Sequence, residues 1–233
     1  MIPNPQSQDT DVAIQGGHSL YTSYSLTRTY RRPYYLMTKR ALDIILSVIG
    51  MICLTPLYIV VAIMIKLEDP KGAVFFRQSR VGLNEKLFDM YKFRSMVSNA
   101  EDLLTDLLDK NEVSGAMFKM KEDPRITKIG KFIRKTSIDE LPQLWNVIRG
   151  DMSLVGPRPA LQREVAEYNT IDKLRLKVKP GCTGLWQVSG RNDLGFEQMV
   201  ELDLKYIKDR SIAYDLKIIL RTVKVLFGAK DAF

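Results

Sequence analysis

The stretch IILSVIGMICLTPLYIVVAIMI, residues 44–65, decides how the rest of the chain is arranged. Its 22 residues include no charged side chain. At about 1.5 Å per residue, a helix of this length reaches roughly 33 Å, enough to cross the hydrocarbon core of a bilayer. The sequence therefore predicts a membrane helix. The alternative is a buried core helix, although such helices rarely run this long.

Two features of this region complicate a simple crossing. Pro56, preceded by Thr55, lies in the middle of the run, where proline removes a backbone hydrogen bond and clashes with the preceding turn. Asp43 stands just inside a basic flank that includes Lys39 and Arg40, an unusual place for an acid unless it pairs with a cation or a backbone end. A broken helix that dips into the membrane is therefore a second interpretation.

Around this run the chain divides into three predicted parts. Residues 1–36 are polar, without apolar periodicity, and predict a flexible tail rather than a signal peptide. Residues 37–66 form the membrane helix, and residues 67–233 a single domain, because 233 residues bury one core and little more. Short strands at 73–77 and 87–94, followed by several amphipathic helices, predict a mixed α/β domain that is mainly helical.

The last of these helices, residues 211–227, has a basic amphipathic pattern. Its apolar stripe consists of Leu216, Ile219, Leu220, Val223 and Phe227, and its basic stripe of Lys217, Arg221 and Lys224. This pattern is typical of a helix at a membrane interface. An ordinary packed C-terminal helix explains it equally well.

The composition restricts the chemistry. Lys and Arg number 35 against 27 Asp and Glu, so the net charge of +8 favours an anionic partner such as phosphate, lipid head groups or nucleic acid. The one histidine, His18, lies in the polar tail, which excludes Ser-His-Asp and Cys-His mechanisms and multi-histidine metal sites. Two cysteines give no disulfide framework. An enzyme of this composition depends on carboxylates, hydroxyls, amines and a hard metal ion.

The stretch TSIDELPQLW, residues 136–145, carries the strongest candidate for such chemistry. Proline suits only the first turn of a helix, so Pro142 predicts a helix that begins a few residues upstream. Asp139 and Glu140 would then lie at the helix N-terminus, where free N–H groups and the dipole lower a carboxylate pKa. Ionised carboxylates suit a Mg²⁺ ligand or a nucleophile. Alternatively, Ser137 and Glu140 form a capping box.

Basic residues at several places are candidates for phosphate binding. Arg158 lies between Pro157 and Pro159, whose fixed φ angles restrict the backbone that presents its guanidinium. Lys92 and Arg94, two apart on a predicted strand, share a face and are placed to bracket a diphosphate.

Two further segments are weaker candidates. Gln78, Arg80 and Gly82 predict a basic bend, and residues 181–191 form a glycine-punctuated loop that ends at Arg191. Each segment is weak evidence by itself, because most lysine and arginine side chains are simply solvated.

The order of these segments closely resembles the bacterial sugar transferase family, the monotopic polyprenyl-phosphate phosphoglycosyl transferases. The resemblance covers about residue 37 to the C-terminus. It rests on Lys39-Arg40 with Asp43, the apolar run with its internal proline, YKFRSM at 91–96, DPR at 123–125, DELPQ at 139–143, GDMSLVGPRP at 150–159 and the late Gly-Trp-Gln-Gly-Arg loop. Larger members carry further N-terminal membrane helices and another domain, so the chain resembles the minimal catalytic form with an added polar tail.

The resemblance implies roles for these residues. Asp139 would be the nucleophile that takes the phosphosugar, and Glu140 would help hold Mg²⁺ at the dyad. Phosphate or nucleotide binding would fall to Lys92, Arg94, Arg134, Arg158 and Arg191. The implied fold is a re-entrant, monotopic membrane helix at 39–66 with a small cytosolic α/β domain and amphipathic interfacial helices.

The resemblance also implies the substrates and the location. The donor would be a UDP-sugar, nearer the hexose-moving members, and the acceptor undecaprenyl phosphate, with membrane lipids as further partners. Because nucleotide sugars are cytosolic, the domain after residue 66 is expected at the cytoplasmic face of the bacterial inner membrane. The basic flank is expected on the same side, which requires a hairpin.

Two other functions are compatible with the sequence. One is a membrane-anchored protein that binds anions or nucleic acid, suggested by the positive charge. No RNA- or DNA-recognition motif occurs, so nucleic acid is not an expected partner. The other is a non-catalytic membrane scaffold of polysaccharide assembly. The sequence does not determine the oligomeric state and leaves a homodimer open.

Overall fold

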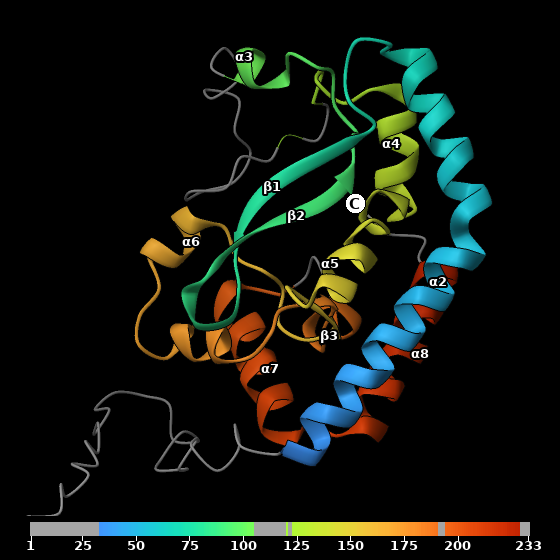
Figure 1. Cartoon of the computed structure of the whole chain (residues 1–233). Helices are drawn as coiled ribbons and strands as arrows, with labels where there is room; N and C mark the ends of the chain where they lie inside the picture. The colour runs from blue at the N-terminus through green and yellow to red at the C-terminus, as the bar shows by residue number, and fades with distance from the viewer. Residues whose placement is uncertain (1–32, 105–119, 121–122, 191–193, 229–233) are drawn as a thin grey trace, which may run out of the picture.

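The computed structural model describes residues 33–104, 120, 123–190 and 194–228. Its first element is a long helix, α2 (Pro33–Glu68), which curves along one side of the domain formed by all later elements (Figure 1). Residues 33–36, expected in the tail, are therefore helical. His18, Arg191 and most of the predicted tail lie outside the described residues.

The domain after α2 is mixed α/β and mainly helical, as the sequence predicts. An antiparallel hairpin, β1 (Phe75–Val81) and β2 (Leu87–Phe93), forms one two-stranded sheet, and the parallel strands β3 (Ser153–Val155) and β4 (Gly181–Thr183) form another. The α-helices are α3 (Ala100–Leu104), α4 (Lys128–Lys135), α5 (Gln143–Arg149), α6 (Gln162–Ala166), α7 (Phe196–Asp209) and α8 (Ile212–Gly228). Short 3₁₀ turns lie at Leu83–Glu85, Ile138–Glu140, Asp172–Lys177 and Trp186–Val188.

The basic bend expected at Gln78–Gly82 is wrong. Gln78 and Arg80 lie inside β1, opposite Met90 and Phe88 of β2. The first strand extends beyond its predicted end because its seven residues match the seven of β2 in a continuous register. The chain turns only from Gly82 onward.

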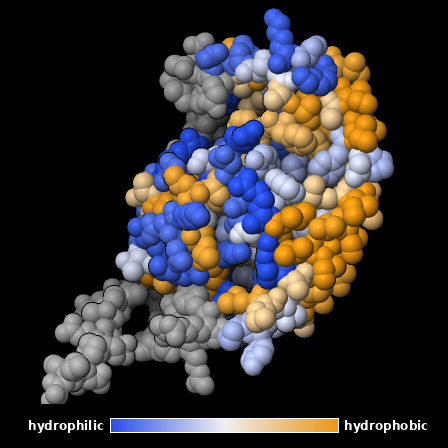
Figure 2. Space-filling view, in the orientation of Figure 1, coloured by the Kyte–Doolittle hydropathy of each residue, from blue (hydrophilic) through white to orange (hydrophobic). Residues whose placement is uncertain are grey.

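Helix α2 exposes apolar side chains and buries polar ones. Its four buried residues are Asp43, Ser47, Val61 and Ile65. Among its exposed residues are Ile45, Val48, Ile49, Ile52, Ile59, Val60 and Ile63, and Figure 2 shows the resulting hydrophobic surface along the outer side of this helix. A core helix would bury its apolar residues, so the alternative of a buried core helix is wrong. The helix continues through Pro56 without interruption, so the interpretation of a helix broken at this proline is wrong; α2 curves along the domain instead (Figure 1).

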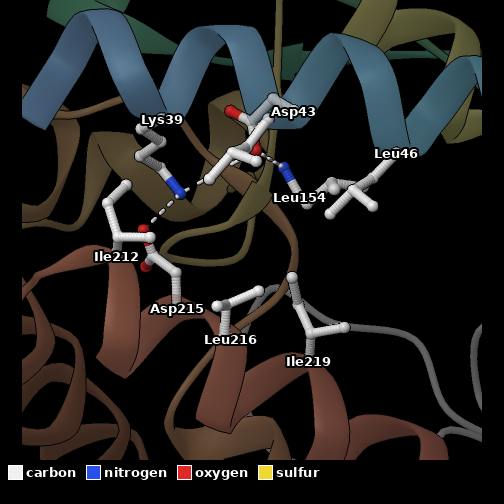
Figure 3. A pocket seen from close by; sticks show the side chains of 9 residues that line it. Lys39, Asp43, Leu46, Leu154, Ile212, Asp215, Leu216 and Ile219 are labelled. Carbon is white, nitrogen blue, oxygen red and sulfur yellow. Dashed lines mark hydrogen bonds and ion pairs between the residues drawn. The ribbon is translucent and has the colours of Figure 1, made fainter.

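The N-terminal half of α2 is held to the domain by a group of side chains that we call the anchor cluster: Tyr35, Lys39, Asp43, Tyr206 and Asp215. The Lys39 ammonium lies 3.0 Å from Asp215 and 3.9 Å from Asp43. Asp43 accepts a hydrogen bond from the backbone N–H of Leu154 at 3.1 Å (Figure 3). The expectation that Asp43 pairs with a nearby cation or a backbone end is confirmed.

Both ends of α2 also meet helix termini of the domain. Arg40 donates to the carbonyls of Val147 and Ile148 in the last turn of α5, at 2.5 and 2.8 Å. At the other end, the Glu68 carboxylate accepts from the N–H groups of Lys128 and Ile129, which begin α4. A cation at a helix C-terminus and an anion at an N-terminus are both stabilising. The long helix is thus fixed at both ends to one domain.

Two of the hydrophobic clusters position the site. One, beneath α7 and α8, includes Val155, Leu185, Tyr206, Ile207 and Ile218. The other joins the second half of α2 to β2 and α4 through Val61, Ile65, Phe93, Ile129 and Ile133. Both α4 and β2 contact the 3₁₀ turn at Ile138–Glu140. This second cluster therefore fixes the position of that turn relative to α2.

Candidate active site

The carboxylates of Asp139 and Glu140 are presented by a short turn between two helices. They lie in the 3₁₀ turn Ile138–Glu140, between α4 and α5. Ser137 enters the turn with φ 56° and ψ 18°, a left-handed conformation that is uncommon for a residue with a side chain. Pro142 follows as the N-cap of α5, which begins at Gln143. The helix start expected upstream of Pro142 is therefore a 3₁₀ turn, with the α-helix beginning after the proline.

The predicted capping box is wrong. The Ser137 side chain makes no capping hydrogen bond. The Glu140 carboxylate instead receives the Lys92 ammonium at 2.6 Å, from the end of β2. This ion pair joins the 3₁₀ turn to the β1–β2 hairpin. Glu140 therefore pairs with a distant residue and not with the backbone of its own turn.

Asp139 differs from its expected ionisation. Its side chain is buried, and burial raises its pKa to about 6, although Lys92 and Arg134 act in the opposite direction. The sequence-based expectation of a lowered pKa for Asp139 is therefore wrong. The physical reason is that a three-residue turn offers little helix dipole, whereas desolvation penalises the charged form strongly. The neighbouring charge of Glu140 raises the pKa further.

Glu140 has the opposite shift. Burial alone would raise its pKa, but the nearby charges of Lys92, Arg158 and Arg80 hold the pKa below its ordinary value. The two adjacent carboxylates thus have pKa values pushed apart, a feature that is common at functional sites. Glu140 is the ionised, cation-bound member, and Asp139 is the desolvated one.

The structure brings three of the five predicted phosphate-binding residues to this dyad. Lys92 contacts Glu140 directly. Arg134 donates from Nε to the Ser95 hydroxyl at 2.7 Å and lies close enough to Asp139 for their charges to interact. Arg158 is exposed and acts electrostatically on Glu140.

Arg94 has other contacts. Its guanidinium lies 3.6 Å from the Asp69 carboxylate and donates to the Asp69 carbonyl at 3.1 Å. It also covers Gly72, where a Cβ atom would come within 1.1 Å of the Arg94 Nη1. Lys92 and Arg94 therefore meet different partners, and Arg94 ties the end of α2 to the hairpin.

Arg80 is a member of the site that the sequence-based list omits. It is 5% exposed and lies near enough to Glu140 and Arg158 for their charges to interact. The sequence draws attention to it only as part of a bend. Recognition of a strand through Gln78 and Arg80 would have placed both side chains on one face, toward the later loops.

The dyad suits a particular kind of Mg²⁺ binding. Within the described ranges, no group of three or more His, Cys, Asp or Glu residues is arranged to hold a metal ion. Mg²⁺ is commonly bound by one or two carboxylates together with substrate phosphates and water. Two adjacent carboxylates therefore fit an ion that arrives with a diphosphate, rather than an all-protein cage.

A desolvated carboxylate, an ionised neighbour and a surplus of cations are groups that can stabilise the transfer of a phosphate group. This site lies on a domain fixed to a long apolar helix. The sequence model described as "Bacterial sugar transferase" matches residues 34–229, and the chain belongs to this family. The resemblance seen in the sequence is thereby confirmed.

Curated relatives share most of this chain. It is 50% identical over 220 residues to the "Galactosyl transferase CpsE" of Streptococcus agalactiae, covering 90% of this chain and 48% of the relative. It is 45% identical to the "Undecaprenyl-phosphate galactose phosphotransferase" of Salmonella typhimurium, covering 84% and 41%. The chain spans about half or less of these two proteins. It also matches the "Exopolysaccharide production protein ExoY" of Sinorhizobium fredii at 38% identity, covering 87% of this chain and 91% of ExoY.

Proposed function

We propose that this protein transfers a hexose-1-phosphate, of galactose or glucose, from a UDP-sugar to undecaprenyl phosphate. The observation that carries the proposal is the buried Asp139 beside the ionised Glu140, both facing cations. The names of the relatives, which specify galactose and undecaprenyl phosphate, support these substrates. The reaction would be the first membrane step of exopolysaccharide, capsule or glycoconjugate synthesis, at the cytoplasmic face of the bacterial inner membrane.

The chemistry proceeds in two displacements. An Asp139 carboxylate oxygen attacks the sugar-linked phosphorus of the donor, the bond between the two phosphates breaks, and UMP leaves. An oxygen of the lipid phosphate then attacks the same phosphorus, which frees Asp139 and yields the polyprenyl diphosphate sugar. A carboxylate stripped of water is a stronger nucleophile than a solvated one, so the burial of Asp139 favours the first step.

The surrounding residues stabilise charge rather than move protons. Lys92, Arg134 and Arg158, whose charges act on the dyad, would neutralise the phosphate oxygens as charge redistributes during transfer. Asp139 and Glu140 would hold Mg²⁺, which, when bound, supplies further neutralisation of the diphosphate. No residue in this arrangement needs to act as a proton shuttle, which agrees with the single histidine of the chain.

The activity is tested with purified protein in lipid nanodiscs, using UDP-galactose, UDP-glucose and other UDP-sugars. We expect UMP release that requires Mg²⁺ and, in multiple turnovers, undecaprenyl phosphate. EDTA should abolish it, and the panel identifies the sugar. A non-catalytic scaffold predicts no UMP with any donor, and that result would overturn the proposal.

The membrane topology that we propose is monotopic, with the curved α2 embedded in one leaflet and both of its ends on the cytoplasmic side. Three observations support it. The outer surface of α2 is apolar, its N-terminal half is bonded to α8 and α5 through Lys39 and Arg40, and its C-terminal end is bonded to α4 through Glu68. A helix that crossed a bilayer of about 30 Å would place these two ends on opposite sides, while one domain holds both.

Cysteine accessibility tests this topology. In a chain whose native Cys53 and Cys182 are replaced by serine, single cysteines at positions 10 and 230 should both be protected from an external reagent in intact cells. Labelling of only one of the two cysteines would contradict the monotopic topology. Replacing Pro56 with leucine should straighten α2 and expose position 10 in part of the molecules.

Helix α8 is proposed to rest on the anionic leaflet. It meets the core through Asp215 and Ile218, while Leu216, Leu220 and Val223 of its predicted apolar stripe are exposed beside Lys217, Arg221 and Lys224. An environment-sensitive probe at position 220 should report burial in anionic nanodiscs. Changing the three cations to glutamine should weaken this burial, since each contributes on the order of 1 kcal/mol near a charged surface. A signal unaffected by salt or by the substitutions would contradict lipid contact.

A further inference from the structure

Arg80 is a buried cation whose bonds in the protein are all to neutral groups. Its Nη1 donates to the carbonyl of Pro159 at 3.2 Å, and its Nη2 donates to the Gln78 side chain at 2.7 Å. Its Nε is buried and has no hydrogen-bond partner. Within the part of the chain that the structure describes, no carboxylate forms an ion pair with it. Burial lowers its pKa to about 10, and Arg158 acts in the same direction.

Such an arrangement is unfavourable in the free protein. A buried charge without an opposite partner loses hydration that neutral hydrogen bonds replace only in part. Two other buried arginines are compensated differently: Arg125 pairs with Asp123 at 2.7 Å, and Arg175 pairs with Asp203. Arg80 lacks the acidic partner that these two arginines possess.

The location of Arg80 indicates what would supply the missing charge. Arg80 donates a hydrogen bond to the carbonyl of Pro159, the residue that follows Arg158. Arg80 therefore supports the turn that presents Arg158. Their charges interact unfavourably with each other, and both interact favourably with Glu140 of the dyad. Glu164 is also within electrostatic range of Arg80, but its carboxylate accepts from the Leu161 N–H at 2.9 Å.

We propose that Arg80 is a positioning residue that helps to bind the sugar-linked phosphate of the UDP-sugar: its buried charge and its bond to the Pro159 carbonyl hold the exposed Arg158 against that phosphate beside the dyad. The inference rests on the proposed function. The anion relieves both the unpaired buried charge and the repulsion between the two arginines, so part of the binding free energy comes from removing a defect of the free protein. Fixing the Pro159 carbonyl keeps Arg158 next to that phosphate.

The test compares UDP and UMP as ligands of the full chain in nanodiscs, by calorimetry in the presence of Mg²⁺. Arg80→Met keeps the alkyl chain and removes the charge. We expect its affinity for UDP to fall at least tenfold, whereas its affinity for UMP, which lacks the second phosphate, changes less than threefold. The matched control is Arg77→Met, which removes an exposed arginine of the same strand and changes the net charge by the same amount. Its affinity for both ligands should equal that of the wild type.

The outcomes separate this inference from the proposed function. If the wild type binds neither ligand, the proposed donor class is wrong and Arg80 has no phosphate to bind. If the wild type binds UDP and Arg80→Met binds it equally well, or loses UMP and UDP in the same proportion, the role of Arg80 is overturned. Should Arg80→Met fail to fold, Arg80→Lys replaces it. Lysine keeps the charge without the fork, so UDP affinity should fall at least threefold, and wild-type affinity would again contradict the proposal.

Discussion

The dyad site and the anchor cluster both bury charged groups, but they balance them differently. In the anchor cluster, Asp215 receives Lys39 and the hydroxyls of Tyr35 and Tyr206, and Asp43 receives a backbone N–H. Each carboxylate is thus satisfied from within the protein. At the dyad site, two carboxylates are faced by four cations: Lys92, Arg80, Arg134 and Arg158.

This difference is the one expected between charges that hold the fold together and charges that we propose bind a ligand. A saturated network costs several kcal/mol when one member is removed, because the remaining partners lose their compensation. A cluster with surplus positive charge is instead completed by an anion from outside, and its electrostatic effect is greatest when charge redistributes during reaction. The predictions below distinguish the two regions by asking whether a substitution lowers stability or activity.

The largest effect is expected from Asp139→Asn. The amide keeps the shape but cannot act as a nucleophile, so UMP release should fall by roughly three orders of magnitude or more. The free energy of unfolding should be unchanged or higher, since the substitution removes a desolvated carboxylate. Incubation of the wild type with labelled UDP-sugar, without lipid phosphate, should give one labelled peptide containing Asp139. A label on another residue, or UMP release only after lipid addition, would favour direct transfer.

The opposite pattern is expected from Asp215→Asn in the anchor cluster. Lys39 would lose its 3.0 Å partner and keep only the more distant Asp43. Loss of one member of a buried ion pair costs about 3 kcal/mol or more, measured by denaturant unfolding, while the turnover of the folded protein should remain close to that of the wild type. Asp209→Asn, an exposed acid at the end of α7, is the control and should leave stability unchanged. Equal loss of activity and stability would show that the two regions are coupled.

A smaller effect concerns pH. The nucleophile must be ionised, and the pKa of Asp139 is raised to about 6. The rate of UMP release in a single turnover should therefore increase as pH rises through about 6 and level off above it. Lys92 lowers this pKa, so Lys92→Met should move the rising limb to higher pH, whereas Asp215→Asn should leave it in place. A limb near pH 4 would contradict the burial of Asp139.

The smallest effect is expected from Arg40→Gln. This substitution removes a cation from the C-terminus of α5, where it bonds to the carbonyls of Val147 and Ile148. The loss should be about 1 kcal/mol in the free energy of unfolding, with catalysis nearly unchanged. Arg149→Gln removes an exposed arginine of the same helix and is the matched control. A strong loss of activity would place Arg40 in the function of the dyad rather than in the attachment of α2.

Patterns along the chain predicted several local features correctly. The uncharged run at 44–65 gave a long helix, and the amphipathic pattern of residues 211–227 gave α8 close to its observed bounds. The ordered motifs pointed to the family that the chain belongs to. These features depend on neighbouring residues in the sequence, so a single chain is sufficient to read them.

Other features were mispredicted because they depend on distant partners. The pKa of Asp139 follows from burial by elements on either side of its turn, not from a helix start. Glu140 pairs with Lys92, 48 positions away, in place of the local capping box. The basic amphipathic pattern of α8 fitted two arrangements. The packing of Asp215 and Ile218 leaves Leu216, Leu220 and Val223 of its predicted apolar stripe exposed, whereas Ile219 packs against the core.

The sequence by itself determined the apolar helix, the order of elements, the acidic dyad and the family. The tertiary structure alone decided which charged residues serve the fold and which face the dyad: Arg94 binds Asp69 beside α2, while Arg80 lies buried behind the turn of Arg158. The physical reason is that charge and residue type are properties of the chain, whereas desolvation and pairing are properties of the space around each side chain. In this protein, that space is formed by segments up to 180 positions apart.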